Sequence, residues 1–142
     1  MALFTIGYEG KALDDVLGKL NANKIELVVD VRALPLSRKK GFSKNAFAKA
    51  LEGVGIAYAH HVALGTPKPM RTRYKRDHDF AALKTAFEKY LADQTYALME
   101  LIDLVKGKRA CLLCFEADPN LCHRSLVAAA ARRLGGPTAK HL

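Results

Sequence analysis

The segment FEADPNLCHR, residues 115–124, has the highest concentration of side chains that can take part in chemistry. It contains a carboxylate, a thiol, an imidazole and a guanidinium: Glu116, Cys122, His123 and Arg124. A carboxylate or an imidazole can transfer protons, a thiol can act as a nucleophile, and a guanidinium can bind an anion. We therefore predict catalytic roles for Glu116, Cys122 and His123, and an anion-binding role for Arg124.

A helix is expected to begin inside this segment, because Asp118 resembles an N-cap and Pro119 suits the first helical position. Cys122 would then lie in the first turn. The positive end of the helix dipole, together with Arg124, would favour its thiolate and attract anions. Two simpler interpretations stay open: Cys122 only packs in the core, and His123 is a cap or surface histidine.

A second group follows the apolar run at residues 25–31. Asp30 and Arg32 flank one apolar residue, so on an extended chain both side chains face the same side. We predict that Asp30 is catalytic and that Arg32 and Ser37 bind an anion. The alternative is a structural ion pair that joins Asp30 to Arg32 or Arg124, and a Glu116–Arg124 pair is equally possible.

Cys111, Cys114, Cys122 and His123 supply four potential zinc ligands. If residues 110–115 form a strand, however, Cys111 and Cys114 point to opposite faces. The adjacent Cys122 and His123 would also diverge on a helix. We therefore predict no metal site and no cofactor.

The charge is concentrated in one part of the chain. Of a net charge of +9, residues 32–76 carry +10, from eleven basic residues and the single acid Glu52. Two basic clusters, residues 37–44 and 68–76, are expected to form loops that bind a polyanion, and their aromatic residues would stack on bases. The residues predicted to bind nucleic acid are Arg38, Lys39, Lys40, Arg71, Arg73, Tyr74, Lys75 and Arg76. The alternative partner is a phosphorylated small molecule.

Apolar runs of strand length alternate with amphipathic segments along the chain. Strands are expected at 3–8, 25–31, 56–60 and 110–115, helices at 12–20, 43–51, 80–91, 95–105 and 121–134, a long basic loop at 60–76, and an edge strand at 138–142. This order predicts one α/β domain over residues 1–142, with a mostly parallel sheet between two layers of helices. Ligands of such sheets bind beyond the carboxyl ends of the strands, where the polar segments above fall.

The composition restricts the class of protein further. The chain has 142 residues, half of them hydrophobic, which suits one folded domain. No apolar run approaches the roughly 20 residues that span a bilayer, and the N-terminus lacks the pattern of a secretory signal. An odd number of cysteines, three, argues against a disulfide framework. We therefore predict a cytoplasmic protein without a membrane partner.

Several segments together resemble a widely distributed family of unknown function, numbered 488. They are TIGY (5–8), VVDVRALPLSR (28–38), GFSK (41–44), GIAYAHHVALG (55–65) and LCFEADPNLCHR (113–124). The resemblance implies an α/β sandwich but no established reaction, and Cys111 is not part of the shared pattern. It also implies a pocket lined by Asp30, Arg32, Glu116, Cys122, His123 and Arg124.

Three functions are compatible with these residues. The first is an enzyme or recognition domain that acts on nucleic acid or a nucleotide through the basic segment and the Asp/Glu/Cys/His/Arg pocket. The second is a thiol enzyme of the rhodanese or phosphatase type, which requires a reactive thiolate beside an electropositive loop. The third is a non-catalytic module that binds a phosphorylated ligand or nucleic acid.

Overall fold

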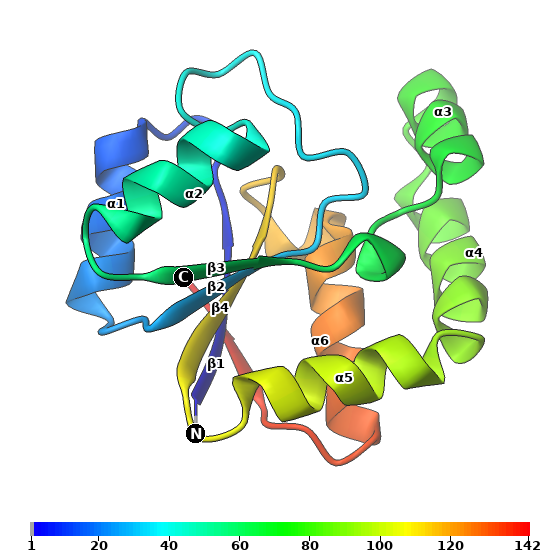
Figure 1. Ribbon diagram of the computed structural model, residues 1–142. Coiled ribbons are helices and arrows are strands. Elements are labelled where there is room, and N and C mark those ends of the chain that lie inside the picture. Colours follow the sequence, from blue (N-terminus) through cyan, green and yellow to red (C-terminus); the bar gives the residue numbers. More distant parts are fainter. Residues whose placement is uncertain (1) are drawn as a thin grey trace.

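Five parallel strands form a single sheet in the computed structural model, which describes residues 2–142 (Figure 1). The strands are β1 (Ala2–Gly7), β2 (Leu27–Asp30), β3 (Ala57–His60), β4 (Arg109–Cys114) and β5 (Ala139–His141). Their order across the sheet is β3-β2-β4-β1-β5, and every neighbouring pair is parallel. The predicted α/β fold is confirmed, and its C-terminal strand lies at an edge, as expected.

Helices cover both faces of the sheet (Figure 1). Those on one face are α1 (Leu13–Ala22) and α2 (Lys44–Glu52), and those on the other are α4 (Phe80–Ala92), α5 (Thr95–Val105) and α6 (His123–Arg133). A further helix, α3 (Lys68–Asp77), packs on α4, and the 3-10 turns are η1 (Val62–Leu64) and η2 (Pro119–Leu121). Among residues 2–142, no helix has the length and apolar character needed to cross a bilayer.

Side-chain alternation along β4 divides the core into two parts. Leu112 and Cys114 pack with α4, α5 and α6, whereas Cys111 and Leu113 pack with α1 and α2. Every residue of β4 after Arg109 is buried, as is typical of a central parallel strand. The expectation that Cys111 and Cys114 face opposite sides is therefore confirmed.

The connections that follow two neighbouring strands run to opposite faces of the sheet. The connection from β2 leads to α2 on one face, and the connection from β4 leads to α6 on the other. Since β2 and β4 lie side by side, their carboxyl ends flank a crevice between diverging connections. Ligands of open α/β sheets bind at such a point.

Two glycines let the connections approach the sheet closely. A Cβ atom on Gly7 would lie 1.8 Å from the carbonyl oxygen of Glu116, and one on Gly65 would lie 2.2 Å from the nitrogen of Ala33. Both obstacles are backbone atoms, which do not swing aside as a flexible side chain does. The segments after β4 and β2 can therefore lie this close only because residues 7 and 65 have no side chain.

Gly65→Ala is expected to lower the free energy of unfolding by about 1–3 kcal/mol, because the new methyl group must displace the backbone at Ala33. Denaturant titration followed by circular dichroism measures this loss. Gly18→Ala is the matched control: Gly18 lies inside α1 with open space around it, so alanine should stabilise the protein by about 0.5–1 kcal/mol. Equal stability of Gly65→Ala and the parent protein would contradict the close approach.

Two predicted boundaries are wrong. Residues 60–76 were expected to form a loop, but the second basic cluster folds as α3, which buries none of its residues. Without a buried face, α3 lacks the apolar periodicity that predicts a helix. Its start follows from Pro69 in the first turn, since proline needs no N–H donor there.

The last helix was expected from about residue 121, but α6 begins at His123. The Asp118 side chain instead caps η2 by accepting a hydrogen bond from the Asn120 nitrogen. Cys122 is the N-cap of α6 and has an extended backbone, with φ −131° and ψ 140°.

Candidate functional site

A cavity of about 410 Å³ opens where β2 and β4 end. Its walls come from the connection after β2, from α3 and from the segment after β4. Apolar and aromatic lining residues include Tyr8, Leu34, Leu36, Tyr74, Leu83, Phe115 and Leu121, and polar ones include Arg32, Ser37, Arg38, Thr66, Arg71, Lys75, Cys114, Glu116 and His123.

The basic residues predicted to bind nucleic acid divide into two groups. Arg38, Arg71 and Lys75 line the cavity with Tyr74, whereas Lys39, Lys40, Arg73 and Arg76 do not. Among the residues that line it, Glu116 carries the one carboxylate. The cavity is therefore apolar in part and surrounded by positive charge.

Asp30 and Arg32 form a buried ion pair. Oδ1 of Asp30 accepts hydrogen bonds from the backbone nitrogen and Nε of Arg32 at 3.0 and 2.9 Å. Its Oδ2 accepts from Nη2 of Arg32 at 2.7 Å and from the Tyr58 hydroxyl at 2.6 Å. Nη1 of Arg32 donates to the Tyr8 hydroxyl and to the Phe42 carbonyl. Both oxygens of Asp30 are engaged, which supports the structural alternative for this residue.

Arg124 is fully buried, yet within residues 2–142 no carboxylate forms an ion pair with it. Its Nε donates to the Thr5 hydroxyl at 3.1 Å. Nη1 donates to the Glu116 carbonyl, and Nη2 donates to the Ala117 carbonyl at 3.2 Å. The alternative pairs with Asp30 and with the Glu116 carboxylate are thus absent from this part of the chain. Arg124 instead holds the segment that follows β4.

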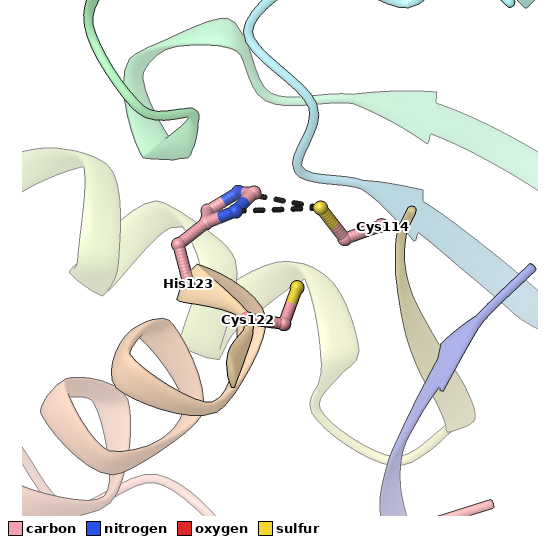
Figure 2. Close-up of side chains that lie close together, drawn as sticks. All are labelled: Cys114, Cys122 and His123. Atoms are coloured by element: carbon pink, nitrogen blue, oxygen red, sulfur yellow. Dashed lines mark hydrogen bonds between the residues drawn. The ribbon is translucent and has the colours of Figure 1, made fainter. Parts of the chain in front are cut away.

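Cys114, Cys122 and His123 converge on one another (Figure 2). Nδ1 of His123 lies 3.3 Å from Sγ of Cys114, and one ligand atom from each of the three residues lies within 4.8 Å of the others. The expectation that Cys122 and His123 diverge is therefore wrong. Because Cys122 precedes the helix in an extended conformation, its side chain turns toward β4, where Cys114 ends the strand.

The two thiols of this cluster differ in acidity. Burial raises the pKa of the Cys114 thiol, and the neighbouring Cys122 raises it further. Burial also opposes ionisation of Cys122, but hydrogen bonds with Cys114 and His123 and the positive charges of His123 and Arg124 outweigh it and lower its pKa. Burial alone would lower the pKa of His123. The hydrogen bond and negative charge of Cys122, together with the hydrogen bond to the Val31 carbonyl, outweigh burial and raise this pKa.

The side chain of Glu116 is half-buried beside this cluster. Burial, followed by the negative charge of Cys122, raises the pKa of Glu116 to about 7. Oε2 of Glu116 lies 3.8 Å from Sγ of Cys114. A carboxyl group with this pKa can both donate and accept protons near neutral pH.

The remaining predicted residue, Ser37, lies in the cavity wall, where its hydroxyl oxygen accepts a hydrogen bond from the Lys39 nitrogen. Sequence reasoning missed the apolar part of the wall. Leu34 and Leu36 are 56% and 66% exposed. The signal available in the sequence was their position between Arg32 and Arg38, at the start of the basic segment 32–76. No signal in the sequence assigned Leu83 of α4 to the cavity.

Comparison with known proteins places these residues in a family context. Searches of curated proteins and of solved structures found no significant match. A family model described as "Domain of unknown function DUF488" matches residues 12–131, which include the basic segment, the ion pair and the Cys–His cluster. The chain therefore belongs to the DUF488 family.

Proposed function

We propose that this protein acts on nucleic acid or on a nucleotide that binds in the cavity between β2, β4 and α3. The observation that carries the proposal is the composition of the cavity wall, which joins a cationic rim to apolar and aromatic surface. Arg38, Arg71 and Lys75 would contact phosphate oxygens. A base or sugar would lie against the apolar part of the wall, beside Phe115 and Leu121.

Aromatic side chains near the rim support a nucleotide over a bare phosphate. Phe115 is 43% exposed and lies edge-on to the Tyr8 ring, with ring centroids 5.4 Å apart. Tyr74 lines the cavity from α3, among the basic residues of that helix. Base–aromatic stacking is tolerant of sequence and contributes about 1–3 kcal/mol per base.

The thiol-enzyme alternative receives less support from the geometry. Its nucleophile would be Cys122, whose side chain is 1% exposed and is not among the residues that line the cavity. Cys122 is followed directly by α6, and Cys114 is followed by a segment that contains Glu116 and Asp118. An anion-cradling loop after a nucleophilic cysteine would instead offer hydrogen-bond donors.

The triple variant Arg38→Ala/Arg71→Ala/Lys75→Ala tests the cationic rim. Fluorescence anisotropy would measure binding to short single-stranded DNA, duplex DNA and RNA over a series of salt concentrations. If all three side chains contact phosphates, the slope of log K against log salt should flatten by about 2–3, since each lost contact removes roughly one released counterion.

The matched control removes the same charge elsewhere. Lys89→Ala/Lys106→Ala/Lys108→Ala changes exposed lysines of α4 and of the turn before β4. This control should keep the parent slope. Equal slopes for the two triple variants would show that binding depends on net charge and would reject the cavity as the binding site.

Glu116→Gln separates an enzyme from a non-catalytic module. If Glu116 transfers a proton to or from the bound ligand, turnover should fall by about 10²–10⁴-fold while binding is preserved. The assay is product analysis, by mass spectrometry, of the oligonucleotides and mononucleotides that bind. Unchanged products and rates in Glu116→Gln would contradict the role of this carboxylate.

A further inference from the structure

We propose that Cys114, Cys122 and His123 form a zinc-binding site at the floor of the cavity. Two thiolates and one imidazole are a donor set that Zn²⁺ prefers. The inference rests on the convergence of these three side chains and goes beyond the proposed function, because it holds whatever ligand the cavity binds. It also revises the expectation, drawn from the sequence, that no metal site is present.

The spacing of the donor atoms suits a tetrahedral ion. Zinc binds sulfur at about 2.3 Å and nitrogen at about 2.0–2.1 Å, so neighbouring ligand atoms lie roughly 3.5–3.8 Å apart around it. Here Sγ of Cys114 is 3.3 Å from Nδ1 of His123, and one atom from each of the three residues lies within 4.8 Å of the others. Coordination would require ligand atoms that lie as far as 4.8 Å apart to approach one another by about 1 Å.

The second nitrogen of His123 is already engaged as in metal sites. Nε2 lies 2.7 Å from the Val31 carbonyl oxygen, to which it donates when protonated. The Phe87 ring packs edge-to-face against the imidazole, with centroids 5.4 Å apart. These contacts fix the imidazole beside the thiols, with its Nδ1 and Nε2 3.3 and 3.9 Å from Sγ of Cys114. A backbone carbonyl on the far nitrogen is the usual partner of a metal-binding histidine, because it sets the tautomer.

Charge and burial also favour the ion. Two thiolates would neutralise Zn²⁺, so the protein would bury no net charge at this position. Cys122 is 1% exposed, Cys114 5% and His123 8%, which shields the bonds from water. All three cysteines of the chain are free thiols, including the two in this cluster.

The fourth coordination position would face the cavity, since Cys114 and His123 line it. Three protein ligands with one open position are typical of catalytic zinc, which activates a bound water or polarises a bound ligand. Glu116 belongs to the same wall, with Oε2 3.8 Å from the Cys114 sulfur. A carboxylate beside such an ion, not bound to it, can exchange protons with the fourth ligand.

The test is metal binding by the reduced, metal-free full-length protein. Titration with Co²⁺ should give thiolate-to-cobalt charge-transfer absorption that saturates at equimolar metal and disappears on addition of Zn²⁺. Cys114→Ser and Cys122→Ser should each weaken binding by about 100-fold or more, because each removes a ligand. Cys111→Ser is the matched control, because Cys111 packs on the opposite face of the sheet and should leave binding unchanged.

Three results would overturn the proposal: binding far below equimolar, cobalt absorption without the thiolate band, or equal loss in Cys111→Ser. Far-ultraviolet circular dichroism must show that each variant is folded. If a serine variant does not fold, His123→Asn, which keeps both thiols, provides the same comparison. The cobalt titration contains no nucleic acid, so its failure would not affect the anisotropy test of the proposed function. Failure of the anisotropy test would likewise leave the zinc site standing.

Discussion

Asp30→Ala is expected to lower the free energy of unfolding by about 3–5 kcal/mol, measured by denaturant titration. The change leaves the buried guanidinium of Arg32 without its counter-charge, and it removes the acceptor of the Tyr58 hydroxyl. A solvent-exposed ion pair would cost far less, but Asp30 is fully buried and Arg32 is 5% exposed.

Two further variants identify the cause of that loss. Tyr58→Phe removes one of the hydrogen bonds to Asp30 and should cost about 1 kcal/mol. The double variant Asp30→Leu/Arg32→Met replaces the whole pair by apolar groups and should be clearly more stable than Asp30→Ala, because no unpaired charge remains. A loss below about 1 kcal/mol in Asp30→Ala would show that the ion pair does not support the fold and would return Asp30 to the catalytic candidates.

Arg124→Met is expected to cost about 2–4 kcal/mol and to loosen the segment after β4. The guanidinium donates to the Thr5 hydroxyl and to the carbonyls of Glu116 and Ala117, and each acceptor that loses its partner is destabilising by about 1–3 kcal/mol when it stays buried. Hydrogen exchange should show faster opening at residues 116–121 than in the parent protein.

The control for Arg124→Met is Arg133→Met on the same helix. Arg133 is exposed in the last turn of α6, so its replacement should change stability by no more than about 0.5 kcal/mol. If Arg124→Met were equally mild and residues 116–121 stayed protected, the guanidinium would not be what holds this segment.

The alternation of strands and helices was predictable because buried parallel strands appear as continuous apolar runs. Residues 110–115 illustrate this, since their apolar run matches β4, the central strand, which has a parallel neighbour on each side. The position of the cavity also followed from the sequence, because the carboxyl ends of parallel strands lie at one edge of the sheet.

Other features depend on contacts that a linear pattern does not contain. Asp30 had two candidate arginine partners, and only the folded chain shows that Arg32 forms the ion pair while Arg124 contacts backbone carbonyls. The convergence of Cys122 with His123 depends on a shift of about two residues in the start of α6, because an N-cap residue and a helical residue project in different directions.

The strand order has a consequence for how the chain folds during synthesis. β1 and β2 are consecutive in the sequence but are not neighbours, because β4 lies between them and pairs with both. Residues 2–105 therefore leave the ribosome before the central strand exists, and β1 has no partner until β4 arrives. Such late, long-range pairing is slow and leaves strand edges open in the meantime. Of the segments that line the cavity, the end of β4 and the start of α6 are therefore synthesised last.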